Sequence, residues 1–175
     1  GEGGMVTTSD PRMAEQARYY RNICFDKDPE KRFVHEHVGH NFRFTNLQAA
    51  VGLAQTEMAS SLVALRRGMA KKYLERLRGW EDWIQLPAEK DWATNVYWMF
   101  GIVLRKRSGL GGAKAKAALE QLGIESRRFF CPAHMQPALP TLIGSVQAPV
   151  SENLWERGLY LPSAGDLTDD EADQV

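Results

Sequence analysis

The sequence lacks an excess of charge of either sign and lacks any long apolar run. Its 175 residues carry 22 basic and 22 acidic side chains, so the formal net charge is zero. This balance argues against a general binder of nucleic acids or anionic membranes, because such proteins need an excess of positive charge. No run of about 18 apolar residues exists, so no segment is predicted to span a membrane.

Cysteine is also scarce. Cys24 and Cys131 are the two cysteines, and their separation does not match the short spacing of metal-ligand motifs. No secretory signal is visible in the sequence. We therefore expect reduced thiols and a cytoplasmic location.

Apolar and aromatic residues are plentiful. They make up 43% of the sequence and include five Trp and seven Phe, which is enough to build a core in roughly one domain. Segments with helical spacing alternate with short β-type segments, so the fold class is predicted to be α/β or α+β. The β-type segments are residues 83–86, 96–104, 124–130 and 159–161. The helical segments that lie between them are residues 113–122 and 151–157.

The first part of the chain is predicted to be mainly helical. Asp10 followed by a proline predicts a helix that ends near residue 22, and a long loop over residues 25–44 follows. Thr45 and Gln48 fit a capping box, which predicts a second helix from there to about residue 77, with a kink near residues 59–61.

At each end of the sequence the pattern predicts a short strand or helix that has nothing to pack against. Residues 5–8 have the pattern of a short strand, and a strand needs neighbours. Thr168 and Glu171 fit a capping box, yet the sequence stops about one turn later. We expect a fragment of a longer protein, or a product trimmed at both ends; the alternative is a complete domain with frayed termini.

Two kinds of motif are weak candidates for ligand sites. The histidines of HEHVGH, residues 35–40, have a spacing that suits a metal on an extended strand, with Glu36 or His134 as a further ligand. The alternative, that they cap or pack within a solvated loop, is favoured, so no metal site is predicted. The glycines of GEGG and SGLGG match neither a P-loop nor a dinucleotide fingerprint.

Two polar stretches are stronger candidates. In GHNFRF, residues 39–44, Asn41 and Arg43 alternate with aromatic residues just before a helix. In RRFFCPAHMQP, residues 127–137, Arg127 and His134 follow a predicted strand, where ligand sites commonly form. On composition alone, an ordinary surface loop is an equal alternative for the second stretch.

Four segments together resemble a known family. GEGGMVTT, GHNFRFTNLQAAVGLAQ, GIESRRFFCPAHMQP and ERGLYLPSAGDLTDDE are similar, in order and spacing, to the C-terminal half of the DegT/DnrJ/EryC1/StrS sugar aminotransferases, most of all to perosamine synthase-like members. The resemblance implies the C-terminal part of a fold-type I pyridoxal-phosphate-dependent transferase. Residues 1–60 would then be a remnant of the large cofactor-binding domain, and residues 61–175 a small α+β domain.

The resemblance also implies roles for individual residues. Asn41 matches the family asparagine that reaches the cofactor phosphate of the other subunit, and Arg43 matches an arginine that supports this loop or the substrate side. Asn41 and Arg43 are therefore both predicted to be cofactor-binding residues. Arg127 and His134 match a loop that faces the nucleotide-sugar substrate. Relatives often have Pro at position 128 and an aromatic residue at position 131, so Arg128 and Cys131 depart from the pattern.

The resemblance implies amino transfer, usually from glutamate, to a keto sugar on a nucleotide by a homodimer or higher oligomer. The family's Schiff-base lysine lies upstream of the segment that matches Gly1, and no lysine of this chain stands in its context. We therefore expect no catalytic residue in this chain, no bound pyridoxal 5'-phosphate and no activity of the chain alone. The alternatives are a stand-alone interaction module derived from the family and an unrelated metal-binding domain.

Overall fold

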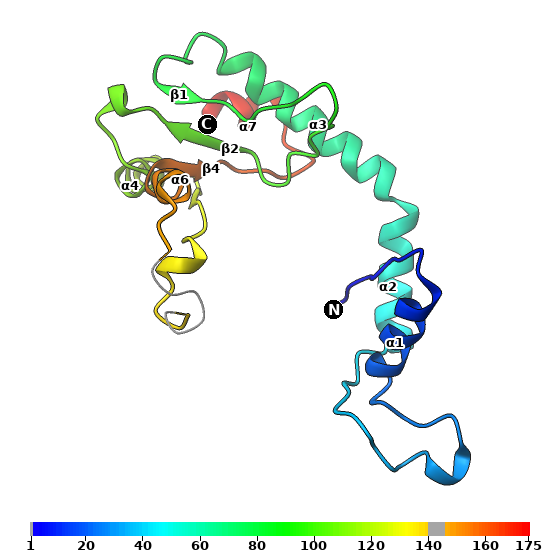
Figure 1. The fold of residues 1–175 in the computed structure, drawn as a ribbon. Coiled ribbons are helices and arrows are strands. Elements are labelled where there is room, and N and C mark those ends of the chain that lie inside the picture. Colours follow the sequence, from blue (N-terminus) through cyan, green and yellow to red (C-terminus); the bar gives the residue numbers. More distant parts are fainter. Residues whose placement is uncertain (1, 140–145) are drawn as a thin grey trace. The chain divides into compact units, whose positions relative to one another are not determined.

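The structure, a computed structural model, describes residues 2–139 and 146–175. The chain divides into two compact units, Gly1–Ala59 and Ser60–Val175 (Figure 1). The assignment of residues 1–60 and 61–175 to a large-domain remnant and a small domain stays a prediction.

The first unit begins with helix α1, Pro11–Arg21, as the sequence predicts. The Asp10 carboxylate accepts a hydrogen bond of 2.8 Å from the Arg12 amide, and proline occupies the first helical turn. The predicted strand at residues 5–8 is wrong, because residues 2–8 pair with no strand among the described residues. Its side chains instead lie in solvent, and Met5 is 81% exposed.

A pair of consecutive helices follows the long loop. Helix α2, Asn46–Glu57, begins with the predicted capping box, in which Thr45 and Gln48 bond each other's backbone amides. Helix α3, Ala59–Arg76, follows after a break at Met58, next to the predicted kink. The loop before α2 contains a single 3₁₀ turn, η1, at Pro29–Lys31.

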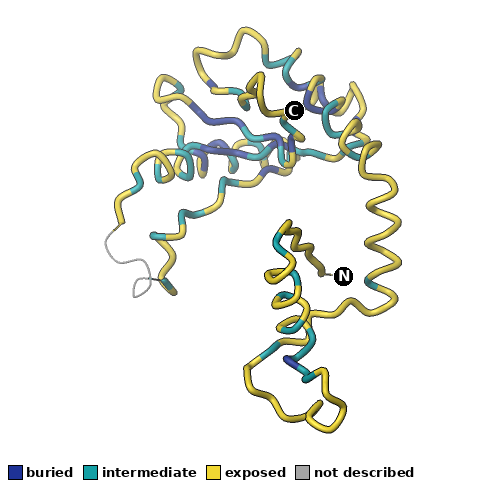
Figure 2. Tube along the Cα trace, turned by 45° about the vertical axis from the view of Figure 1, so that its right-hand side comes forward, coloured by how far each residue is buried: buried dark blue, intermediate teal, exposed yellow. Residues whose placement is uncertain are grey.

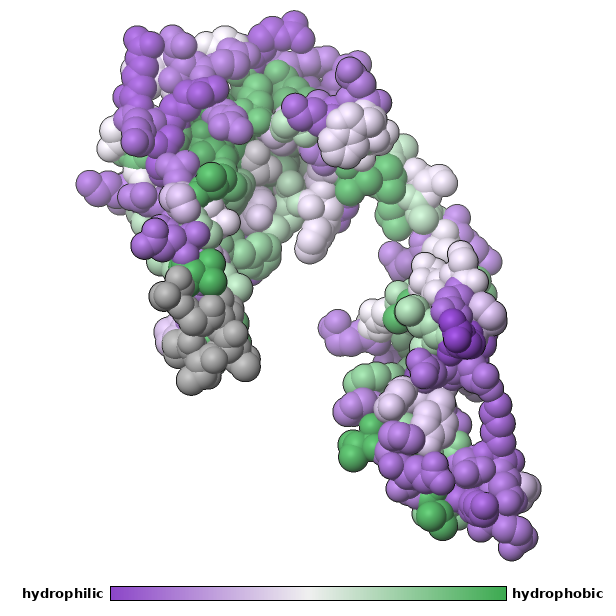
Figure 3. All heavy atoms as spheres, in the orientation of Figure 1, coloured by the Kyte–Doolittle hydropathy of each residue, from purple (hydrophilic) through white to green (hydrophobic). Residues whose placement is uncertain are grey.

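Almost all burial lies in the second unit. Figure 2 shows buried residues along its strands and on α3, whereas in the described part of the first unit Cys24 is the one buried residue. Hydrophobic and hydrophilic residues are interspersed on the face that Figure 3 shows. On α2, Leu47 is 82% exposed and Val51 61% exposed, so this helix packs no apolar face against the described residues.

The second unit is built on a four-stranded antiparallel sheet of order β1-β2-β4-β3. Its strands are β1 (Ile84–Gln85), β2 (Gly101–Leu104), β4 (Gly158–Tyr160) and β3 (Arg127–Arg128). One turn of α3 packs on the sheet through Met69 and Tyr73, which meet Phe100 and Leu159 in the core. The antiparallel pairing makes this unit α+β, one of the two predicted classes.

Two predicted strands are much shorter than expected. The strand predicted over 96–104 begins only at Gly101, because the Asn95 side chain accepts the Tyr97 amide at 2.8 Å and Tyr97 adopts a φ of 51°. This local turn removes the preceding residues from the ladder. The strand predicted over 124–130 is reduced to β3, because β4 offers only three residues for pairing.

The remaining elements lie close to their predicted positions. Helix α4, Gly112–Gln121, is followed by Gly123 with a φ of 77°. Helices α6 (Pro149–Arg157) and α7 (Asp169–Gln174) also lie close to their predicted positions. The 3₁₀ turns η2 (Lys106–Ser108) and η3 (Ala133–Met135) were not predicted. Residues 140–145, which follow η3 in the sequence, lie outside the described residues.

Across residues 2–139 and 146–175, no helix has the length and apolar character that a membrane crossing needs.

Candidate functional site

The stretch around Asn41 is held extended by the end of α1. The His40 amide donates to the Tyr20 carbonyl at 2.8 Å, and the Phe42 amide donates to the Arg21 carbonyl at 3.0 Å. In return, the Ile23 amide donates to the His40 carbonyl at 3.1 Å. The backbone of this loop is therefore fixed by hydrogen bonds to the end of α1.

This backbone pairing does not use the side chain of Asn41. Its backbone forms a bridge with Asn22, while the rings of His40 and Phe42 stack on each other at 4.8 Å. Because side chains alternate along an extended chain, Asn41 points away from that stacked pair. The exposed Asn41 amide makes no hydrogen bond with any residue that the structure describes.

Arg43 is used within the loop. Its guanidinium donates to the Asn22 side-chain oxygen and lies 6.0 Å from the centre of the Phe25 ring. These contacts tie the segment that precedes α2 to the turn that follows α1. The arrangement fits a residue that supports the loop, and a direct contact of Arg43 with a cofactor stays a prediction.

The histidines of HEHVGH are engaged separately. His35 Nδ1 donates to the Ile23 carbonyl at 2.9 Å, His37 lies 3.5 Å from the Tyr19 hydroxyl, and His40 stacks on Phe42. Within residues 2–139 and 146–175, no group of three or more His, Cys, Asp or Glu side chains is placed to hold a metal ion.

In the second unit, strand β3 sends its two arginines in opposite directions. Arg127 is exposed, with its guanidinium 4.7 Å from the centre of the Phe130 ring. Arg128 is half-buried, stacks 4.7 Å from the Trp155 ring and donates to the Trp155 carbonyl at 3.2 Å. Arg127 is thus the arginine that a ligand can reach, whereas Arg128 holds α6.

Aromatic packing on glycine fixes the exit of β3. The Phe129 ring stacks on Tyr160 at 4.4 Å and lies so close to Gly158 that a Cβ atom there would approach it to 2.3 Å. A Cβ atom on Gly101 would approach the same ring to 2.8 Å. Only glycine at these two positions lets the ring lie flat on the strands.

His134, from η3, is hydrogen-bonded to Glu152 on α6. Its Nε2 atom lies 2.9 Å from Glu152 Oε1, and only 11% of its side chain is exposed. The hydrogen bond from His134, with a second from the Ala148 amide, holds the pKa of Glu152 below its usual value. Glu152 and Trp155 had no sequence signal, because their partners lie far away along the chain.

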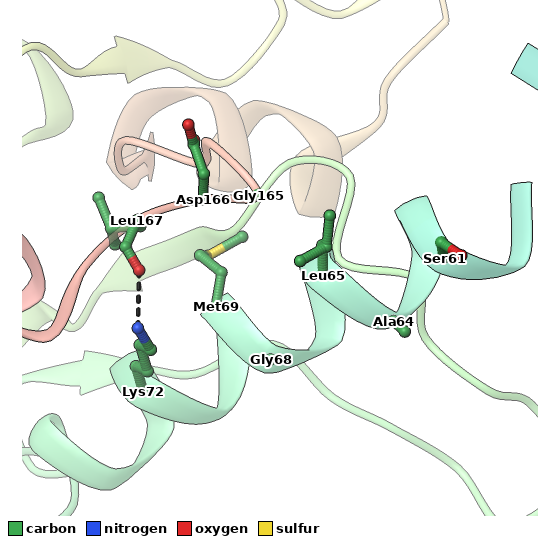
Figure 4. Close-up of a pocket in the computed structure, with 9 residues that line it drawn as sticks. All are labelled: Ser61, Ala64, Leu65, Gly68, Met69, Lys72, Gly165, Asp166 and Leu167. Atoms are coloured by element: carbon green, nitrogen blue, oxygen red, sulfur yellow. Dashed lines mark hydrogen bonds between the residues drawn. The ribbon is translucent and has the colours of Figure 1, made fainter. Parts of the chain in front are cut away.

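An open hollow of about 640 Å³ lies elsewhere in this unit, between α3 and residues 165–167 (Figure 4). Leu65 and Met69 line it from the helix, and Lys72 spans it by donating to the Leu167 carbonyl at 2.7 Å. None of the four predicted site residues lines this hollow. The candidate sites are therefore the Asn41 loop in one unit and the Arg127–His134 segment in the other.

Comparison with known proteins gives a match over the full chain. The family model described as "DegT/DnrJ/EryC1/StrS aminotransferase family" matches residues 1–175. Two GDP-perosamine synthases are similar over 175 residues: that of Vibrio cholerae is 32% identical and that of Caulobacter vibrioides 33%. The chain spans about half the length of these relatives, with 47% and 46% of them covered.

Solved aminotransferase structures share the fold. Helicobacter pylori PseC, an aminotransferase of pseudoaminic acid biosynthesis, superimposes with a TM-score of 0.81 at 20% identity, over 95% of this chain and 44% of its own. DesV of S. venezuelae, solved in complex with a ketimine intermediate, gives a TM-score of 0.78 at 27% identity, over 95% of this chain and 43% of its own. The chain therefore has the fold of part of a fold-type I pyridoxal-phosphate-dependent aminotransferase, as the sequence predicts.

Proposed function

The chain belongs to the DegT/DnrJ/EryC1/StrS aminotransferase family, and on that basis we propose that it forms the C-terminal half of a nucleotide-sugar aminotransferase. The observation that carries the proposal is the family match over residues 1–175. The enzymes of this family depend on pyridoxal phosphate. The proposed reaction moves an amino group from an amino acid, glutamate in our proposal, to the keto carbon of a sugar attached to a nucleotide.

The Asn41 loop contributes a contact to the cofactor phosphate of the partner subunit. The amide is exposed and free of hydrogen bonds to the described residues, and its NH₂ group is a donor that suits a phosphate oxygen. Arg43 holds the loop through Asn22, which keeps the amide in place. Because Asn41 serves the neighbouring subunit, the active enzyme is a homodimer or a higher oligomer.

Arg127 and His134 bind the nucleotide sugar. The exposed Arg127 guanidinium presents paired donors to the diphosphate, a geometry in which arginine binds phosphate oxygens at two points. The Phe130 ring beneath it limits its rotation. His134 comes from the same segment and is held at one ring nitrogen by Glu152.

The bound cofactor supplies the electron-accepting ring that amino transfer requires, and it is held by a lysine. We propose that this lysine is not one of the eight in this chain. The contacts of four of them support the proposal: Lys27, Lys71, Lys72 and Lys116 each lie in an ion pair with a carboxylate. For Lys27, the hydrogen bond to Glu15 raises the pKa of the ammonium group, and a lysine held in its charged form is a poor nucleophile.

A comparison of two proteins tests the proposed function. The full-length product of the gene that encodes this chain is incubated with pyridoxal phosphate, glutamate and a nucleotide-linked keto sugar, and the 175-residue chain is incubated in the same way. We expect the amino sugar and 2-oxoglutarate from the full-length protein only. A full-length protein that transfers no amino group, yet retains a specific protein partner, would favour the interaction module instead.

A further inference from the structure

One face of α6 holds the ligand-binding segment at two points. Glu152 and Trp155 are three residues apart, so they lie on the same side of this helix. The ring of Trp155 stacks on the Arg128 guanidinium, and the carboxylate of Glu152 is hydrogen-bonded to the His134 ring. The segment that carries Arg127 and His134 is therefore fixed to α6 at its beginning and near its end.

The contact with Glu152 determines which ring nitrogen of His134 carries a proton. A carboxylate that is ionised at neutral pH can only accept a hydrogen bond, and the pKa of Glu152 is lowered from its usual acidic value. His134 Nε2 must then be the donor in the 2.9 Å bond. In the neutral ring this leaves Nδ1 with its lone pair, and Nδ1 bonds no residue that the structure describes.

The same carboxylate is itself fixed. Glu152 Oε1 also accepts the Ala148 amide at 3.3 Å, at the residue that caps α6. The carboxylate therefore has a partner on its own helix as well as in η3. With 11% of its side chain exposed, His134 has little freedom to turn its ring over.

From this geometry we propose that Glu152 is a positioning residue, which holds His134 so that Nδ1 accepts a hydrogen bond from a hydroxyl group of the nucleotide sugar. The inference rests on the proposed function and adds to it the atom, the partner group and the residue that orients it. Arg127 binds the diphosphate, and His134 recognises a hydroxyl on the ribose or on the hexose. Glu152 acts only through the imidazole and touches no substrate atom.

Steady-state kinetics of the full-length protein tests the inference. Glu152→Ala should raise the KM for the nucleotide keto sugar about tenfold, as expected when a hydrogen bond to an oriented polar group is lost, while kcat stays within about twofold. Glu152→Gln should recover most of this loss, because its amide oxygen can still accept from Nε2. Glu156→Ala, which removes an exposed carboxylate from the same helix, is the matched control and should leave the KM unchanged.

A double-mutant cycle separates positioning from stability. In a His134→Ala background, Glu152→Ala should have no further effect on the KM, because the group through which it acts is gone. Equal effects in both backgrounds, or a loss of melting temperature that accounts for the change, would overturn the inference. If the enzyme is active and Glu152→Ala leaves the KM unchanged, as Glu156→Ala should, the inference is overturned as well. The proposed function would not be affected by that result.

Inhibitors identify the group that His134 contacts. Pyrophosphate has no sugar hydroxyl, so its inhibition constant should be the same in wild type and Glu152→Ala. An effect on nucleoside diphosphate inhibition would assign the bond to the ribose, and an effect confined to the nucleotide sugar would assign it to the hexose. A loss of pyrophosphate affinity equal to the KM change would show a phosphate contact and overturn the inference. A wild-type protein that binds none of these ligands would overturn the proposed function itself.

Discussion

Gly39 lies directly against Cys24. A Cβ atom on residue 39 would come within 2.6 Å of both the backbone nitrogen and the Sγ atom of Cys24. Cys24 is fully buried, and both it and Ile23 adopt positive φ angles, 53° and 60°. The turn after α1 therefore has a left-handed backbone that only a residue without a side chain can approach. The position of the Asn41 loop depends on this contact.

Gly39→Ala should therefore loosen the Asn41 loop. The added methyl group collides with backbone as well as with sulfur, so the change should destabilise the loop by about 2 kcal/mol, in the range of overpacked sites. Amide hydrogen exchange at His40 and Phe42 measures the effect locally. Gly52→Ala is the control, because nothing lies within 4 Å of its Cβ position, in the interior of α2. The control should stabilise the helix by about 1 kcal/mol.

A carboxylate network should make the second unit sensitive to acid. Glu89 accepts hydrogen bonds from Arg67 at 2.7 Å, from the Asn95 amide at 3.0 Å and from the Tyr97 hydroxyl at 3.1 Å. These bonds, that from Arg67 first, lower the pKa of Glu89 below its usual 4.5 in the folded state. The stability that they contribute is present above about pH 4.5 and is lost as the pH falls through the lower, folded-state pKa.

Thermal unfolding between pH 7 and pH 3 measures this dependence. Glu89→Gln should lower the melting temperature at pH 7 and should reduce the drop on acidification, because the group that becomes protonated is missing. Glu81→Gln is a control carboxylate with no contact to Arg67. A Glu89→Gln protein with the same acid-induced drop as wild type would show that Glu89 does not contribute to it.

The features that could be predicted from the sequence are those that depend on residues close together along the chain. The capping boxes at Thr45 and Thr168 form as expected, because each is closed by a residue three positions away. The strand over 96–104 was overestimated, because an Asn95 side chain redirects the backbone of Tyr97. Apolar alternation carries no information about such a competing hydrogen bond.

The sequence suggests the exposed polar residues of the candidate site, whose roles stay predictions, and does not suggest the residues that contact them. Asn41 and Arg127 lie exposed on extended segments, where motif spacing places them. Glu152 was not predicted, because its contact with His134 closes a loop across 18 residues. A lone glutamate on a helix resembles any solvated residue, and only the fold brings it to the imidazole.

Cofactor labelling should separate the chain from the full-length protein. The 175-residue chain, mixed with pyridoxal phosphate and reduced with borohydride, should carry no pyridoxyl group on a lysine after gel filtration. Lys27, for example, has its pKa raised by the hydrogen bond to Glu15, which disfavours the uncharged amine that must attack the cofactor. The full-length protein should be labelled on one lysine outside this chain. Stoichiometric mass labelling of any of the eight lysines of the chain would contradict the proposed division of roles.

Asn41 provides the last prediction, because the structure separates its backbone from its side chain. The backbone pairs with Asn22, and this pairing survives replacement of the side chain. The exposed amide has no hydrogen bond with the described residues. Asn41→Ala should therefore change the free energy of unfolding of the chain by no more than about 0.5 kcal/mol, as at other surface positions. Urea unfolding of the two proteins measures the difference.

In the full-length enzyme the same substitution should weaken cofactor binding. One donor to the phosphate is lost, and a hydrogen bond to a charged group contributes about 1.5–3 kcal/mol, so the affinity for pyridoxal phosphate should fall roughly 10- to 100-fold. Asn46→Ala, at the first residue of α2, is the matched amide control and should leave this affinity unchanged. A loss of several kcal/mol from the isolated chain with unchanged cofactor affinity in the enzyme would show that Asn41 holds the loop together and does not contact the phosphate.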